Sequence, residues 1–341
     1  MEKYKDYILD FLKKILETES PSGFCQNIMK LIKEEANDMG YDMEFTNKGC
    51  GVIKIEGKNK EVLGLSAHVD TLGAMVRSIK SNGTIRFTSI GGYLMNSIEG
   101  EYCKIFTRDG KEYDGTILTT KPSVHVFSDA SEHKRIEENM EVRIDESVLS
   151  KEDVEELGIE VGNFIAFDPR VQITKSGYIK SRHLDDKAGI ATIFALMKYI
   201  KDNNIIPDNT IKIFISTYEE VGHGSSYIPQ DITEMIAIDM GAMGDDLCCT
   251  EHDVSICVKD SSGPYDYNMV NELVRIAKDK EIGYALDVYP NYGSDASAAL
   301  RAGNNIRGAL IGPGVHASHG MERTHIEGIL NTLKLLSEYV K

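Results

Sequence analysis

Several residue classes that mark other kinds of protein are scarce or absent in this chain of 341 residues. Lysine and arginine (38) are outnumbered by aspartate and glutamate (54), and the formal charge of −16 argues against nucleic acid or an anionic membrane as a partner. No apolar stretch approaches the length of a membrane-spanning helix, and the first residues lack the apolar core of a signal peptide. We therefore expect a cytoplasmic protein with no nucleic-acid and no membrane partner.

Cysteine pairs and tryptophan are also missing. Without a Cys-x-x-Cys pair, the sequence predicts neither a thiolate zinc site nor a disulfide framework. Without tryptophan, an aromatic platform for sugar rings is poorly supplied. The six cysteines are scattered along the chain: Cys25, Cys50, Cys103, Cys248, Cys249 and Cys257.

The chain does contain alternating strand and helix patterns towards both ends. Such alternation is typical of an α/β fold with a mostly parallel sheet flanked by helices, in which ligands bind outside the carboxyl ends of the strands. The strand-like segments are 51–56, 63–70, 210–216, 234–239 and 308–311, and the helical ones are 4–18, 24–39, 190–200, 267–278 and 326–339.

The middle of the chain has a different texture. Between about residues 76 and 174, short alternating runs are separated by turn signals such as Ser81-Asn-Gly83 and Arg108-Asp-Gly110. We therefore predict a catalytic domain formed by residues 1–75 and 175–341, with an inserted, mostly β domain at 76–174.

The stretch Leu63-Gly-Leu-Ser-Ala-His68-Val-Asp70 organises the candidate chemistry. It is predicted to be a buried strand that carries a histidine and an aspartate at its C-terminal end. His-x-Asp alone is a weak signal, because many histidines are hydrogen-bonded core residues and many aspartates cap helices. More groups of suitable chemistry follow at predicted strand ends or loops: Asp185, Asp186, Glu219, Glu220, Asp239 and His319.

So many carboxylates cannot gather without compensation. Either their pKa values rise or metal ions neutralise them. Imidazole and carboxylate donors without thiolate suit Zn²⁺, Co²⁺ or Mn²⁺, and two ions about 3.5–4 Å apart would polarise a carbonyl and activate a water. Purely structural roles are the alternative, with Asp185-Asp186 as a helix cap and Glu219-Glu220 as an exposed turn. Such residues are not expected by chance at the ends of several strands at once.

As an ordered set, six motifs resemble those of metallopeptidase family forty-two in clan MH, over essentially the whole chain. This group includes the tetrahedral (TET), glutamyl and deblocking aminopeptidases and CelM-like proteins that sometimes carry an endoglucanase label. The resemblance implies a zinc-peptidase-like (phosphorylase/hydrolase-like) fold and a dinuclear metal aminopeptidase acting on short peptides. The motifs are Ala67-His-Val-Asp70, Leu184-Asp-Asp-Lys-Ala-Gly189, Tyr218-Glu-Glu-Val-Gly222, Ile238-Asp239, Gly293-Ser-Asp-Ala296 and Ser318-His319-Gly-Met-Glu322.

The resemblance also implies roles for individual residues. Asp185 would bridge two divalent ions, with His68, Asp239, Glu220 and His319 completing the two coordination shells. Glu219 would be the general base, and Asp70 would orient His68. The Asp185-Asp186 peptide would be cis, and the β insertion would be a dimerisation domain whose dimers build a hollow dodecamer.

Two departures from the family pattern and two other functions stay open at this point. Thr71 stands where many relatives have glutamate, which could alter the pocket wall, and His316 is the alternative to His319 as the last ligand. His325 is expected to cap or pack against the last helix. A glycoside hydrolase also uses two carboxylates but needs no histidine-rich metal cluster. A non-catalytic assembly protein would require a lost base or ligand, and each position is filled.

Overall fold

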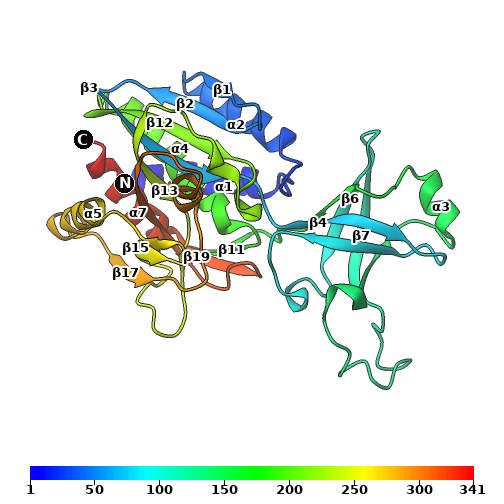
Figure 1. The fold of residues 1–341 in the computed structure, drawn as a ribbon. Helices are drawn as coiled ribbons and strands as arrows, with labels where there is room; N and C mark the ends of the chain where they lie inside the picture. Colours follow the sequence, from blue (N-terminus) through cyan, green and yellow to red (C-terminus); the bar gives the residue numbers. More distant parts are fainter.

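The protein has two lobes joined by a narrow connection, a large α/β domain and a six-stranded barrel (Figure 1). The structure is a computed structural model that describes residues 1–341. The barrel strands lie between Gly73 and Phe167, and the strands before and after them belong to the larger domain. No helix combines the length and the apolar character needed to cross a membrane. All six cysteines are free thiols.

A ten-stranded sheet forms the centre of the larger domain. Its middle strands β12, β3, β13 and β18 are mutually parallel, whereas β2 and β15 run antiparallel to β12 and β18. The sheet is therefore more mixed than the sequence indicated. In spatial order the strands are β1 (Met43–Phe45), β2 (Gly51–Ile55), β12 (Asn209–Ser216), β3 (Asn59–His68), β13 (Ile232–Ile238), β18 (Arg307–Val315), β15 (Val254–Asp260) and β16 (Gly263–Pro264), with β14 (Gly241–Ala242) beside β18 and β17 (Tyr284–Val288) beside β15.

Helices cover both faces of this sheet. The long helix α4 is apolar nearly all round because it packs between the sheet and two neighbouring helices, α1 and α7, within a core of 60 buried residues. On the other face, α6 contributes Ala299 to a smaller cluster of seven. The helices are α1 (Lys5–Leu16), α2 (Gln26–Asp38), α4 (Leu184–Asp202), α5 (Tyr267–Asp279), α6 (Asp295–Arg301) and α7 (Ile326–Tyr339), with short 3-10 turns η1 (Glu2–Tyr4), η4 (Glu219–Val221) and η5 (Gly224–Ser226).

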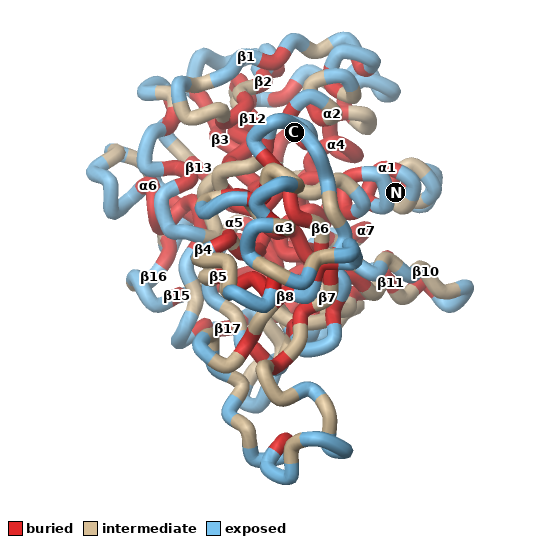
Figure 2. The backbone as a smooth tube through the Cα atoms, turned by 90° about the vertical axis from the view of Figure 1, so that its right-hand side faces the viewer, coloured by how far each residue is buried: buried red, intermediate tan, exposed pale blue.

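The smaller lobe is a closed antiparallel barrel with its own core of 16 buried residues. Closure leaves no free strand edge. The segment between β7 and β8 projects from the barrel as a long, mostly unburied loop, seen at the lower end of Figure 2. The barrel order is β4 (Gly73–Ile79), β5 (Ile85–Ile90), β8 (Met140–Ile144), β7 (Glu112–Thr119), β6 (Tyr102–Phe106) and β9 (Phe164–Phe167), with η2 (Met95–Ser97), η3 (Glu137–Asn139) and α3 (Lys151–Glu156) in the connections.

A small antiparallel sheet connects the chain leaving the barrel to the chain entering α7. It consists of β10 (Gln172–Ile173), β11 (Tyr178–Ser181) and β19 (Glu322–His325), with β11 in the middle. Segments about 140 positions apart in the sequence are thereby fixed side by side, next to the start of α4.

Candidate metal centre

The carboxyl ends of three neighbouring strands place candidate residues at one edge of the large sheet. His68 is the last residue of β3, and Ser216, the last residue of β12, lies opposite it in a parallel pair. On the other side of β3, Asp239 follows the last residue of β13. The η4 turn carries Glu219 and Glu220 directly after β12. This is the edge at which open α/β sheets bind ligands.

Asp185 lies between two histidines from distant parts of the chain. Its Oδ1 is 3.1 Å from Nε2 of His68, and its Oδ2 is 3.3 Å from Nε2 of His319. The Asp185–Asp186 peptide is cis, as the family resemblance implied. One carboxylate thus contacts two imidazoles, one with each oxygen, which is the placement that a ligand bridging two ions requires.

The two glutamates of η4 are buried to different degrees. The Glu220 side chain is 3% exposed, its Oε2 lies 3.4 Å from Nε2 of His319, and its Oε1 has no hydrogen-bond partner. The Glu219 side chain is 16% exposed, and its Oε2 lies 3.7 Å from Nε2 of His68. A buried carboxylate oxygen without a partner is costly, so the free oxygen of Glu220 fits a bound cation.

Two further aspartates lie close to His68. The Asp186 carboxylate is buried and accepts hydrogen bonds from the main-chain N–H groups of His68 (3.2 Å) and Gly189 (3.1 Å). Asp239 accepts one from the N–H of Met240 (2.7 Å). Both oxygens of Asp186 are thus engaged by the backbone, whereas Asp239 accepts a main-chain hydrogen bond at Oδ1 alone.

The donor set fits divalent metal ions. The ligand atoms of His68, Asp185 and Glu220 lie within 4.8 Å of one another, and so do those of His68, Asp186 and Asp239. Imidazole nitrogens and carboxylate oxygens without thiolate are the donors typical of catalytic zinc and of related transition ions. Two overlapping groups of donors therefore meet at His68.

Burial and mutual repulsion raise the pKa of most carboxylates in this cluster. Burial and the charge of Asp185 raise the pKa of Asp239 to about 7. Burial, followed by neighbouring charges, also raises the pKa values of Asp186, Glu219 and Glu220. For Asp185 burial acts in the same direction, but the two imidazoles outweigh it and hold its pKa below the ordinary value. A cluster of this charge calls for cations, as the sequence indicated.

Asp70 holds the glutamate turn more directly than it holds His68. Nδ1 of His68 is 2.9 Å from the main-chain oxygen of Asp70 and 3.6 Å from its carboxylate. That carboxylate accepts hydrogen bonds from the N–H groups of Glu219 (3.1 Å) and Glu220 (3.2 Å) and from the Ser22 hydroxyl (2.5 Å). The orienting contact expected from the Asp70 side chain is therefore made mainly by its backbone, because the side chain anchors η4.

Glu322, the first residue of β19, fixes the backbone at two candidate ligands. Its buried carboxylate accepts hydrogen bonds from the N–H of Asp185 (3.1 Å) and from the N–H of His319 (3.0 Å), one at each oxygen. Burial and the charge of Asp185 raise the pKa of Glu322 to about 8. The sequence reasoning used Glu322 only as part of a motif, and that motif was the one available signal of its role.

His319 is the point at which the barrel domain reaches the site. Its Nδ1 lies 2.5 Å from the main-chain oxygen of Gly92, in the loop after β5. Although burial alone lowers the pKa of His319, its contact with Asp185 raises that pKa to about 10. His319 contacts Asp185 and Glu220, whereas the alternative ligand His316 is exposed and pairs with neither. The structure thus brings His319 to the cluster and leaves His316 apart.

A cavity of about 520 Å³ opens onto the cluster. Arg301 is the single lysine or arginine on its wall. Thr71 does not line this cavity: it is buried, and its N–H donates to the main-chain oxygen of Ser20. The wall also includes Asp185, Glu219, Glu220, Asp239, Met240, Leu247, Tyr289, Asn291, Tyr292, Ser318 and His319.

Comparison with known proteins decides the family. The family model described as M42 glutamyl aminopeptidase matches residues 49–335. The chain belongs to this M42 family. The YhfE protein of Bacillus subtilis (strain 168), an aminopeptidase by name, is 47% identical to it over 335 residues, which cover 98% of this chain and 97% of the relative. This M42 protein is a metal-dependent aminopeptidase, and neither glycoside hydrolysis nor a non-catalytic role is favoured.

More distant members extend the comparison. The glutamyl aminopeptidase of Lactococcus lactis is 26% identical over 63% of this M42 chain and 60% of its own length, and the lysyl aminopeptidase of Pyrococcus furiosus is 24% identical over 62% and 60%. Two solved structures share the fold: an aminopeptidase from Desulfurococcus kamchatkensis (TM-score 0.89, 22% identity, 99% and 95% of the chains) and the dodecameric TET1 of Pyrococcus horikoshii (TM-score 0.84, 23% identity, 97% and 98%).

Proposed function

We propose that this M42 aminopeptidase removes N-terminal residues from short peptides with two divalent ions and with Glu219 as the general base. The observation that supports it best is the Asp185 carboxylate, which contacts His68 with one oxygen and His319 with the other. Asp186 is left out of the ligand set because its oxygens already accept main-chain hydrogen bonds. The proposed ligands are His68, Asp185 and Asp239 for one ion and Asp185, Glu220 and His319 for the other.

Main-chain carbonyls orient both histidines, which would be neutral ligands once an ion is bound. The Nδ1–H of His68 donates to the oxygen of Asp70, and the Nδ1–H of His319 donates to the oxygen of Gly92. In each ring Nε2 faces the carboxylate of Asp185 and would bind the ion in place of a proton. A hydrogen bond at the far nitrogen is the usual way in which a protein fixes the tautomer of a metal-binding histidine.

Glu219 is the proposed general base. When bound, the ions supply Lewis-acid polarisation of the scissile carbonyl and activate the attacking water. Glu219 takes the proton from that water and passes it to the leaving amine. Its partial exposure at the cavity wall supports this role, whereas the almost fully buried Glu220 is better placed as a ligand.

If the N-terminal residue of the substrate is acidic, its side-chain carboxylate has one cationic partner in the cavity, Arg301. The names of the relatives point both ways, to glutamyl and to lysyl substrates. After the ions neutralise the acidic cluster, the guanidinium of Arg301 is the remaining cationic side chain of the wall. Charge complementarity therefore favours peptides that begin with an acidic residue over those that begin with lysine.

The barrel is proposed as the dimerisation domain, and dimers could build a dodecamer as the TET1 relative does. This proposal is supported by apolar side chains on the barrel and its loops that are exposed in the single chain and that a partner subunit would bury. They are Leu94, Val124, Val126, Ile136, Leu149 and Val161. Light scattering tests the assembly: a monomeric particle would contradict it, as would a dimer unaffected by Val124→Asp with Val126→Asp.

Metal dependence and substrate class are tested together. We expect hydrolysis of aminoacyl p-nitroanilides that is lost with a chelator and restored by Zn²⁺, Co²⁺ or Mn²⁺, with Zn²⁺ and Co²⁺ the leading candidates by donor type. A soluble β-glucan serves as the control substrate and should not be cleaved. Peptide hydrolysis that survives complete metal removal would overturn the proposal. A cytoplasmic location remains a prediction from the sequence.

A further inference from the structure

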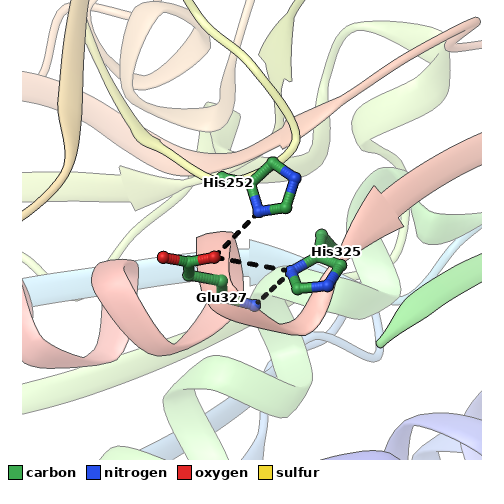
Figure 3. A group of neighbouring side chains, drawn as sticks. All are labelled: His252, His325 and Glu327. Atoms are coloured by element: carbon green, nitrogen blue, oxygen red, sulfur yellow. Dashed lines mark hydrogen bonds and ion pairs between the residues drawn. The ribbon is translucent and has the colours of Figure 1, made fainter. Parts of the chain in front are cut away.

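A second cluster of imidazole and carboxylate lies outside the catalytic centre (Figure 3). It consists of His252 in the turn before β15, His325 at the end of β19 and Glu327 in the first turn of α7. Their ligand atoms lie within 4.8 Å of one another. We propose that these three residues form a third metal site, which takes a divalent transition ion such as Zn²⁺ and which is separate from the two-ion centre.

The donor atoms converge on one carboxylate oxygen. Nδ1 of His252 is 2.8 Å and Nδ1 of His325 is 3.9 Å from Oε2 of Glu327, and both rings turn this nitrogen toward it (Figure 3). In a tetrahedral zinc site with bonds of about 2.0–2.1 Å, neighbouring donors lie about 3.3 Å apart. The observed distances bracket that value. The Glu327 side chain is 60% exposed, so it is free to make the small adjustment needed.

Both histidines have their other nitrogen occupied in the manner of metal ligands. Nε2 of His325 donates to the main-chain oxygen of Ser176 (2.8 Å), and Nε2 of His252 lies 3.4 Å from the Tyr178 hydroxyl. His325 thus repeats the arrangement found at His68 and His319, where the far nitrogen donates to a carbonyl, whereas the far nitrogen of His252 faces a hydroxyl. Nδ1 of His325 accepts a hydrogen bond from the N–H of Glu327 (3.2 Å), so this nitrogen is unprotonated, and an ion would take its lone pair in place of that helix cap.

Close packing fixes the backbone around the cluster before any ion binds. A Cβ atom at Gly328 of α7 would lie 2.4 Å from the main-chain oxygen of Glu251, and one at Gly177 would lie 2.5 Å from Nε2 of His325. The Asn331 amide also donates to the main-chain oxygen of His252 (2.9 Å). The two glycines and this hydrogen bond hold the His252 turn and β11 against α7, so the donors are preorganised.

An ion here would connect the His252 turn, β19 and α7. One of its ligands, His325, is on the same strand as Glu322, which supports the catalytic centre. The sequence reasoning expected His325 only to cap or pack against α7, and it does form that cap. Three residues before it on β19, about 10 Å along an extended strand, Glu322 holds the backbone of Asp185 and His319. To bind Zn²⁺, Nδ1 of His252 would give up its hydrogen bond to Glu327, and the ring proton would be carried by Nε2.

The test is a zinc count on the purified protein after its catalytic ions are loaded. Elemental analysis after gel filtration should give one more equivalent of Zn²⁺ for the parent than for His252→Ala or Glu327→Gln. The matched control is His125→Ala, an exposed histidine outside both clusters, which should keep the additional equivalent. Zn²⁺ should also raise the melting temperature of the parent and of the control more than that of His252→Ala.

Two results would overturn the third site: equal zinc content in the parent and in both cluster variants, or an equal thermal shift in all of them. Asp185→Ala separates this proposal from the catalytic one. If only the catalytic assignment is wrong, Asp185→Ala keeps its catalytic ions while His252→Ala still loses one equivalent. If only the third site is wrong, Asp185→Ala loses its catalytic ions and His252→Ala loses none.

Discussion

The two clusters of imidazole and carboxylate in this molecule differ mainly in how far their carboxylates are buried. At the catalytic cluster, the side chains of Glu220 and Asp185 are 3% and 7% exposed, although that of His319 is 39% exposed. At the second cluster, His252 is 41% and Glu327 is 60% exposed. Water can solvate the charge of Glu327 without an ion, whereas the buried carboxylates have only protons or metal ions to neutralise them. The catalytic cluster therefore needs a cation to neutralise its charge, whereas the second cluster can bind one but does not need it.

The largest effect should come from Asp185→Ala, which removes the one carboxylate that contacts both catalytic imidazoles. We expect loss of the catalytic ions and of peptide hydrolysis, measured by elemental analysis and by release of p-nitroaniline. Glu327→Gln is the matched change in the exposed cluster and should leave hydrolysis intact. If both variants lost hydrolysis equally, burial would not be what separates the clusters.

Glu219→Gln should keep the ions and lose turnover, because it removes the proton acceptor but no proposed ligand. A general base contributes about 10²–10⁴-fold, so kcat should fall by that order. Steady-state kinetics and elemental analysis on the same preparation check both statements. A metal-free Glu219→Gln protein would reverse the assignments of Glu219 and Glu220.

Glu322→Gln should weaken metal binding without abolishing it. Glutamine offers one acceptor oxygen in place of two, so one of the two N–H groups, of Asp185 or of His319, loses its partner. Removing support of this kind lowers metal affinity about 10–100-fold. Competition with a chromogenic chelator measures the change, and Glu251→Gln, which alters a nearby pair with Arg323, is the control. Unchanged affinity would show that the backbone holds its position without Glu322.

Arg301→Gln should change substrate preference rather than general activity. An exposed charge-assisted contact justifies the lower end of about 1.5–3 kcal/mol, which is roughly a tenfold loss in kcat/KM for glutamyl substrates. Alanyl substrates should be unaffected. Arg275→Gln, on the surface of α5, is the control. Equal losses on glutamyl and alanyl substrates would exclude a role for Arg301 in recognising a carboxylate.

The smallest effect concerns the second cluster without metal. In the presence of a chelator, His252→Ala should lower the free energy of unfolding by about 0.2–1 kcal/mol, because it breaks a half-exposed pair with Glu327. Urea unfolding compared with His125→Ala measures this difference. A much larger loss would mean that His252 supports the fold by packing. The zinc content of the parent would then be compared with that of Glu327→Gln alone.

Prediction from the sequence succeeded where local pattern and motif agreed. The buried strand ending in His68 and the helix over 326–339 follow from apolar periodicity, and the short runs between turn signals predicted a middle segment rich in strands. Helix α6 was missed because seven residues rich in alanine and serine carry no amphipathic pattern. Thr71 was expected near the pocket because it adjoins Asp70, yet adjacent residues at a strand end point in different directions.

The sequence by itself determined which chemistry the chain carries: histidines and carboxylates at strand ends, no paired thiols, and a set of motifs specific to one family. Tertiary structure decided which of those groups meet. Only folding brings His319 rather than His316 to Asp185, turns the Asp70 carboxylate to η4, and places Arg301 on the cavity wall. The physical reason is that a side chain's partners depend on strand register, packing and burial, which join residues far apart in the sequence.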